Sequence, residues 1–141
     1  MKDWYKKRYW IVGASEGLGL ALAQKMSEAC ASLILTARNE ARLKEIASTL
    51  PNEVEVLPLD ITDLNAVRKS VKKLENVDGF VFLAGTYWPM PAQHWDIEKL
   101  TAMIDVNLIG ALHTLDVILP IFLKKNRGHL VFTGSLALSL I

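Results

Sequence analysis

The sequence predicts an α/β protein built on a doubly wound parallel sheet, with three layers in the order α/β/α. Two observations lead to this class: short runs of apolar and β-branched residues, and stretches of helical periodicity that alternate with them. Such alternation gives right-handed crossovers between parallel strands. The chain ends shortly after the fifth run, so we expect a sheet truncated after its fifth strand.

The predicted strands are nearly continuous in apolar residues, which is typical of strands covered by helices on both faces. They lie at residues 9–13, 33–37, 54–58, 80–84 and 130–133. The predicted helices show apolar residues three or four positions apart. In chain order these sets are Leu18, Leu22 and Met26; Leu43, Ile46 and Leu50; Leu64, Val67, Val71 and Leu74; and, in a long helix within residues 97–125, Ile104, Leu108, Leu112 and Leu115.

Local signals mark where some of these helices begin and end. Asn39 and Asp63 precede helical runs and are expected to act as N-caps. The long helix is expected to stop at Asn126-Arg-Gly128, through the glycine. Pro120 removes one backbone hydrogen bond late in that helix, so we expect a bend or an early end there.

Composition narrows the class of protein. A chain of 141 residues is expected to form one domain, here residues 1–141. The net charge of +1 argues against nucleic acid as a partner. Without a secretory signal, and with no apolar run near the roughly 18 residues of a membrane helix, we expect no membrane contact. A single cysteine fits a reducing compartment, so a cytoplasmic location is expected.

The last strand would form an apolar sheet edge that nothing beyond it covers, because residues 136–141 contain neither a charge nor a turn residue. Exposed apolar edges favour association. We therefore expect that the chain is cut inside a domain.

A glycine-rich turn follows the first strand and opens the first helix. It reads Gly13-Ala-Ser15-Glu-Gly17-Leu18-Gly19. A diphosphate is favoured at a helix N-terminus, and glycines let it approach the backbone. A structural tight turn would explain any one glycine, but the strand before and the helix after favour a dinucleotide site on a Rossmann-like sheet.

The end of the second strand indicates which dinucleotide is bound. Near this point an acidic side chain takes the ribose 2′-hydroxyl, whereas an arginine accommodates a 2′-phosphate. Arg38 stands there, with Thr36 and Ala37 before it, so NADP is favoured over NAD. The alternative is a solvated arginine without a ligand, and Glu16 in the turn counts slightly against a nearby phosphate.

These features, with others that follow in order, resemble the short-chain dehydrogenase/reductase family of the classical type. The resemblance covers the N-terminal part of that family. Besides the glycine turn it includes Asp60-Ile61 at the adenine position, Ala84-Gly85 after the fourth strand, Asn107-Leu-Ile-Gly110 in the long helix, and Gly134-Ser135 after the fifth strand.

The resemblance implies hydride transfer between NADP(H) and a small alcohol or carbonyl, with two catalytic residues inside this chain. Ser135 would hydrogen-bond the carbonyl oxygen, and Asn107 would support a proton-relay water. A tyrosine acid tuned by a lysine is also implied, but no Tyr-x-x-x-Lys occurs in these 141 residues, which by themselves are expected to be inactive. A second departure is Phe82-Leu83, where the family carries paired asparagines.

Several alternatives stay open. Ser135 could be a strand-end cap, and the kink or hydrogen bond that an asparagine inside a helix requires could explain Asn107. A non-catalytic dinucleotide-binding module that assembles through residues 97–125 is the alternative function, and the long helix also allows a homo-oligomer. Trp88 and Trp95 could line a substrate cleft or pack the loop. The histidines show no ligand spacing, so no metal site is expected.

Overall fold

A computed structural model describes residues 4–134, and it confirms the predicted fold class. The strands form one parallel sheet in the order β3-β2-β1-β4-β5, so the chain winds outward in both directions from β1. Its elements are β1 (Arg8–Val12), α1 (Gly17–Glu28), β2 (Ser32–Thr36), α2 (Glu40–Thr49), β3 (Val54–Val56), α3 (Leu64–Lys69), α4 (Val71–Leu74), β4 (Gly79–Phe82), a 3₁₀ turn (Ala92–His94), α5 (Ile97–Ile104), a π-helical turn (Asp105–Ile109), α6 (Gly110–Lys125) and β5 (His129–Phe132).

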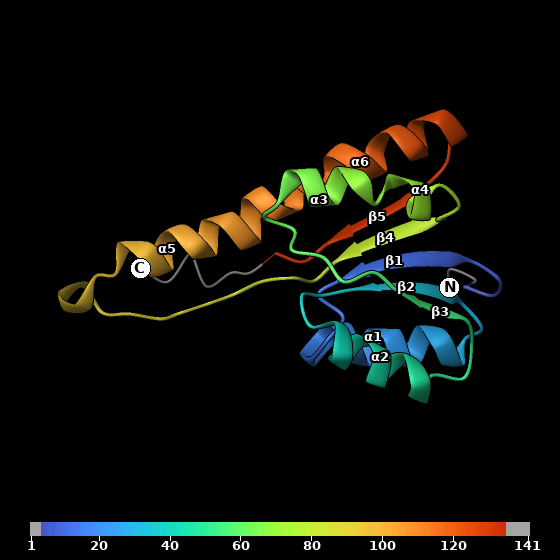
Figure 1. The fold of residues 1–141 in the computed structure, drawn as a ribbon, viewed down its shortest axis with the longest axis horizontal. Helices are drawn as coiled ribbons and strands as arrows, with labels where there is room; N and C mark the ends of the chain where they lie inside the picture. The colour runs from blue at the N-terminus through green and yellow to red at the C-terminus, as the bar shows by residue number, and fades with distance from the viewer. Residues whose placement is uncertain (1–3, 135–141) are drawn as a thin grey trace.

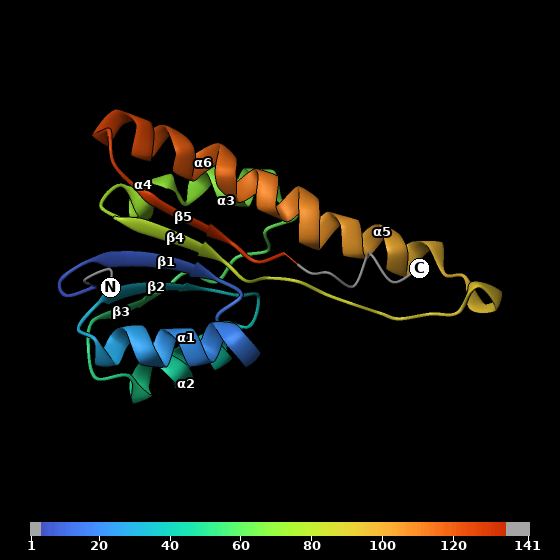
Figure 2. The same ribbon diagram turned by 180° about the vertical axis from the view of Figure 1, so that it is seen from behind.

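The helices cover the sheet on both faces. Helices α1 and α2 lie on one face, and α3, α4 and α6 lie on the other (Figures 1 and 2). Helix α5 extends past the sheet, and the segment after β4 runs beside it. Helix α5 extends from the sheet on the side of the carboxyl ends of the strands (Figure 1), which is the edge where parallel α/β sheets bind ligands.

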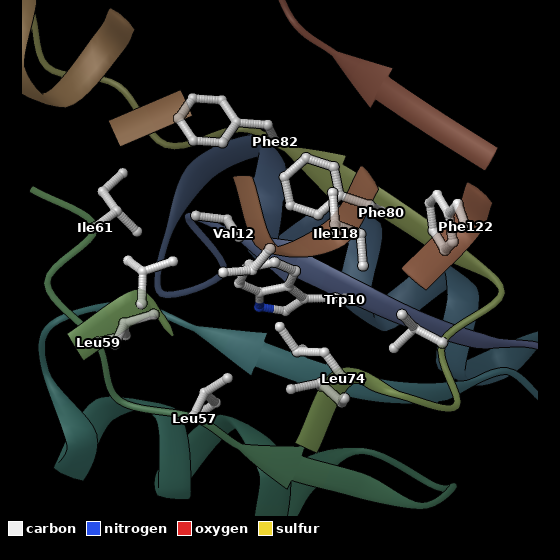
Figure 3. Close-up of a cluster of buried hydrophobic side chains, with 14 residues drawn as sticks. Trp10, Val12, Leu57, Leu59, Ile61, Leu74, Phe80, Phe82, Ile118 and Phe122 are labelled. Carbon is white, nitrogen blue, oxygen red and sulfur yellow. The ribbon is translucent and has the colours of Figure 1, made fainter. Parts of the chain in front are cut away.

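The strands contribute side chains to two apolar clusters, because successive side chains of a strand point to opposite faces of the sheet. Trp10 and Phe80 lie in the cluster under α3, α4 and α6, with ring centroids 5.0 Å apart (Figure 3). Trp10 is fully buried, and its indole N–H donates to the hydroxyl of Thr36 at 2.8 Å. Tyr9 and Ile11 belong to the cluster under α1 and α2. The continuous apolar runs are thus explained.

The third predicted strand ends earlier than expected, at Val56. Its hydrogen bonding to β2 continues, since the amides of Leu57 and Leu59 donate to the carbonyls of Leu35 and Ala37 at 2.9 and 3.0 Å. The extended course of the chain therefore persists to the residues just before Asp60.

Two details of the predicted helices were wrong. Leu18 does not share a buried face with Met26: it is 62% exposed, and the buried residues of α1 include Gly19 and Ala23. The small residues face the sheet because the glycine turn brings this end of α1 close to β1. The third predicted helix is interrupted at Ser70, whose hydroxyl donates to the carbonyl of Val67 at 2.7 Å.

The predicted N-caps are confirmed, and the C-cap is corrected. The side chains of Asn39 and Asp63 each accept a backbone N–H three residues ahead, at 3.0 Å. At the end of α6 the left-handed residue is Asn126, with φ of +49°, and not Gly128. Gly128 is needed for another reason, because a Cβ there would meet the ring of Phe122.

The long helix forms over residues 97–125 and continues past Pro120, so the proline does not end it. Contrary to the sequence prediction, it is long and apolar enough to cross a membrane by length and composition alone. One side packs into the core through Val117, Ile118 and Phe122. Ile104, Leu108 and Leu112 are more than half exposed, whereas Leu115 is partly buried.

Candidate functional site

A cavity of about 640 Å³ opens at the carboxyl edge of the sheet. The turns after β1 and β2, the segments after β3 and β4, and the end of α5 with the π-helical turn form its walls. Every residue that the sequence predicted for cofactor binding lines it, namely Gly13, Ser15, Gly17, Leu18, Gly19, Arg38, Asp60, Ile61, Ala84 and Gly85. Residues far apart in the chain thus converge on one space.

Gly13 lets the first turn pass close to the end of β4. Its φ is +90°, and a Cβ there would lie 2.5 Å from the backbone nitrogen of Ala84 and 2.7 Å from its Cα. Both contacts are with backbone, which cannot move aside as a flexible side chain can. The amide of Gly13 donates to the carbonyl of Thr36 at 2.9 Å. The close packing of the glycine turn on Ala84 therefore requires glycine here.

Gly17 is glycine for a different reason. Its φ is +53°, and a Cβ there would meet nothing within 4 Å, so the open space above it belongs to the cavity. The first backbone bond of α1 runs from Leu20 to Glu16 at 3.2 Å. Among the described residues, the amides of Gly17, Leu18 and Gly19 have no acceptor. These amides at a helix N-terminus suit a bound anion.

Asp60 and Arg38 give one end of the cavity its charge. The carboxylate of Asp60 accepts hydrogen bonds from the backbone N–H and the hydroxyl of Thr62, at 2.9 and 2.7 Å. These bonds, with the nearby charge of Arg38, hold the pKa of Asp60 below its ordinary value. Asp60 is thus an ionised acceptor near neutral pH, and Arg38 is exposed beside it.

The long helix holds the Asp60–Ile61 segment from behind. The carbonyl of Ile61 lies 2.9 Å from Nδ1 of His113, and a Cβ on Gly110 would lie 2.7 Å from the side chain of Ile61. His113 is therefore hydrogen-bonded to the backbone of this segment. No group of three or more potential metal ligands occurs within residues 4–134.

Asn107 does not line the cavity; it fixes the segment that does. Its Oδ1 accepts the Thr86 N–H at 2.7 Å, and its Nδ2 donates to the Thr86 carbonyl at 2.9 Å. It lies in the π-helical turn, so both local reasons that the sequence left open, a helix irregularity and a hydrogen bond, are present. The same side chain lies close to Gly85, because a Cβ added to Gly85 would be 3.5 Å from Oδ1 of Asn107.

The departure at Phe82 is accommodated by aromatic packing. Phe82 is buried, and its ring is stacked on that of Phe132 in β5 at 5.7 Å. Phe80 lies 5.5 Å from the same ring. Phe82 therefore makes apolar contacts with β5 at the first of the two positions that carry asparagine in the family the sequence resembles.

Some site residues escaped the sequence analysis. Thr62 and Thr86 line the cavity, as do Asp105 and Val106 on the π-helical turn. A threonine two positions after Asp60 is the one signal that could have been read, since short polar side chains often bond locally in this way. Trp88 lines the cavity, but Trp95 does not. The predicted catalytic residue Ser135 lies outside the described residues.

Comparisons with known proteins agree with this geometry. The sequence profile of the family described as short chain dehydrogenase matches residues 7–139. An uncharacterised oxidoreductase of Staphylococcus epidermidis is 35% identical over 131 residues, which cover 90% of this chain and 57% of that protein. A similar oxidoreductase of Staphylococcus saprophyticus is 31% identical over 135 residues, covering 90% and 58% of the two chains.

Solved structures give the same picture. Serine dehydrogenase from Escherichia coli has a TM-score of 0.88 at 27% identity, covering 95% of this chain and 64% of its own. A short-chain type dehydrogenase/reductase from Mycobacterium marinum has a TM-score of 0.89 at 24% identity, covering 99% and 60%. The chain spans less than two thirds of the length of each of these proteins.

Proposed function

Since the chain belongs to the short-chain dehydrogenase family, we propose that it binds NADP(H) in preference to NAD(H). We also propose that the protein interconverts a small alcohol and a carbonyl by hydride transfer. One observation carries the first statement: Arg38 and Gly17, above which the space is open, line the same cavity. A diphosphate and a ribose 2′-phosphate can therefore be held by one extended ligand. The second statement rests on the family.

The residues present fit such a dinucleotide. The amides of Gly17, Leu18 and Gly19 would receive the diphosphate, and the open space over Gly17 lets it approach. Arg38 would pair with the 2′-phosphate, which an acidic residue at this point would repel. Asp60 and Ile61 would contact the adenine, and Ala84-Gly85 would lie against the middle of the ligand, as would Ser15.

The chemistry then divides between ligand and protein. When bound, the nicotinamide supplies or accepts the hydride. Ser135 would donate a hydrogen bond to the carbonyl oxygen, stabilising the negative charge that develops there. Asn107 would act by position, because its side chain already bonds the backbone of Thr86 beside the cavity. A tyrosine acid with its lysine is not among these 141 residues.

The partners that we propose follow from charge and exposure. A small carbonyl or alcohol is the substrate, and a net charge of +1 gives no reason to expect nucleic acid. The exposed leucines of residues 97–125 favour a homo-oligomer formed through this helix. We propose a cytoplasmic location with no membrane contact, because one side of the helix is already used by the core.

Calorimetric titration of the purified chain with NADPH and, separately, with NADH tests the binding proposal. We expect NADPH to bind more tightly, and we expect Arg38→Asp to reverse the preference, because the carboxylate repels the 2′-phosphate and accepts from the 2′-hydroxyl. An unchanged ratio of affinities would remove the basis for NADP. Absence of binding by folded protein would refute the cofactor assignment altogether.

Steady-state NADPH oxidation with a panel of carbonyls tests the catalytic part. Without the proton donor, which contributes typically about 100- to 10,000-fold, the 141 residues are expected to show no measurable turnover. Turnover by this chain would show that a different residue supplies the proton. The alternative function, a non-catalytic dinucleotide-binding module, would be favoured if the natural protein lacked Tyr-x-x-x-Lys and bound the dinucleotide without turnover.

A further inference from the structure

Three consecutive residues of the glycine turn are tied to the end of β2 and the first turn of α2. The amides of Gly13 and Ala14 both donate to the carbonyl of Thr36, at 2.9 and 3.1 Å. The carbonyl of Ser15 accepts from Nε of Arg42 at 3.3 Å. The first two bonds use backbone atoms and are available to any sequence, whereas the third depends on one side chain.

The position of Arg42 is itself well determined. Its backbone N–H is capped by the side chain of Asn39 at 3.0 Å, so it stands in the first turn of α2. Another guanidinium nitrogen pairs with Glu45 at 2.7 Å, and the side chain is 39% exposed. Arg42 does not line the cavity. It therefore reaches the turn from outside and leaves the ligand space clear.

The turn has few other supports at this point. Glu16, the residue before α1, makes no side-chain capping bond, and Gly17 follows with a positive φ and open space around it. Gly17, which has no Cβ, therefore does not by itself restrict the backbone at this point. The anion-binding amides begin immediately after it.

We propose that Arg42 is a positioning residue for the dinucleotide, a role that depends on the binding function proposed above. By holding the carbonyl of Ser15, it fixes the turn so that the amides of Gly17–Gly19 point at the diphosphate. The segment Thr36–Arg42 then does two tasks: Arg38 distinguishes the ribose, and Arg42 sets the geometry of the diphosphate site.

This role makes a prediction that separates the two arginines. NADPH and NADH share the diphosphate, so loss of Arg42 weakens both by the same factor. Loss of Arg38 weakens NADPH selectively, because NADH lacks the 2′-phosphate. Adenosine 2′-monophosphate carries that phosphate without a diphosphate, so it depends on Arg38 and not on Arg42.

The experiment compares Arg42→Met with Arg68→Met, each of which removes a positive charge and an exposed ion pair. Arg68 pairs with Asp116 at 2.9 Å on the other face of the sheet. We expect Arg42→Met to weaken NADPH and NADH alike by about three- to tenfold, the size of one net hydrogen bond. We expect Arg68→Met to change neither, and Glu45→Gln to leave both within about twofold, because the bond to Ser15 remains.

Three outcomes overturn the role of Arg42. They are unchanged affinities in Arg42→Met, a loss confined to NADPH, which would indicate direct contact with the 2′-phosphate, and an equal loss of adenosine 2′-monophosphate, which would indicate general damage. Thermal unfolding by circular dichroism confirms that each variant is folded. Failure of the unmodified protein to bind either dinucleotide would refute the proposed function itself, and is thereby distinguished from failure of Arg42.

Discussion

Two glycines of the same turn are predicted to respond differently to the same change: Gly13→Ala should mainly lower stability, and Gly17→Ala should mainly lower affinity. In Gly17→Ala the added methyl group meets no atom within 4 Å, and φ is +53°. The cost is that of one left-handed residue, about 1–2 kcal/mol. In Gly13→Ala the methyl group meets the backbone of Ala84 at 2.5 Å, with φ of +90°. Overpacking adds about 1–3 kcal/mol, so the total is about 2–5 kcal/mol.

The order is reversed for binding. The space over Gly17 is where we propose that the diphosphate approaches the amides of α1, and a methyl group there would hold the ligand away. A hydrogen bond to a charged group contributes about 1.5–3 kcal/mol, so loss of one weakens NADPH roughly 10- to 100-fold. Gly13→Ala is expected mainly to lower the free energy of unfolding. The folded molecules of this variant should bind NADPH with much less loss of affinity than those of Gly17→Ala.

Urea unfolding followed by circular dichroism gives the free energies of unfolding, and calorimetric titration gives the affinities. Each variant serves as the control for the other, since both add one methyl group to the same turn. If Gly17→Ala bound NADPH as the unmodified chain does, no diphosphate would lie over that residue. A Gly13→Ala variant as stable as the unmodified chain would show that the close contact with Ala84 is not required.

Three further predictions concern the surroundings of the site. Asn107→Ala should destabilise the fold by about 1 kcal/mol, since the lost bonds to Thr86 outweigh a gain in helix propensity of roughly 0.5 kcal/mol. Faster hydrogen exchange of the Thr86 amide would show the loss directly. Burial raises the pKa of Tyr9 above its ordinary value of 10.0, so the free energy of unfolding should fall as pH rises past 10. Tyr9→Phe, which loses the bond to His129, should reduce this fall when unfolding is measured as a function of pH. Leu112→Glu should reduce self-association in sedimentation velocity, because Leu112 is 51% exposed; an unchanged distribution would exclude this helix face as the interface.

The fold was predictable because each strand is buried on both faces and therefore stands out as an apolar run. Trp10 and Tyr9, adjacent in β1, enter different clusters because successive side chains of a strand point to opposite faces of the sheet. The glycine turn was predictable for a related reason. Each of its glycines meets a local geometric requirement, such as a positive φ at Gly13, that other residues rarely satisfy.

Other features could not be read from the sequence, because they depend on partners distant along the chain. Nothing near Arg42 indicates that its side chain will reach Ser15, 27 positions earlier. The clamp of Asn107 on Thr86 likewise needs the long helix to lie beside the segment after β4. At the end of α6, Asn126 takes the left-handed conformation, and the ring of Phe122 accounts for the glycine two residues later.

The two walls of the cavity are supported by different elements, and this division explains why the long helix matters to the site. The glycine turn is held by Thr36 of β2 and by Arg42 of α2. The opposite wall is held by one stretch of the long helix, in which Asn107 bonds Thr86 and Gly110 admits Ile61. Because the spacing of three residues places both groups within one turn, a single helix segment fixes the loops after β3 and β4 together. Any movement of that helix, including one caused by association through its exposed face, would therefore shift both loops at once.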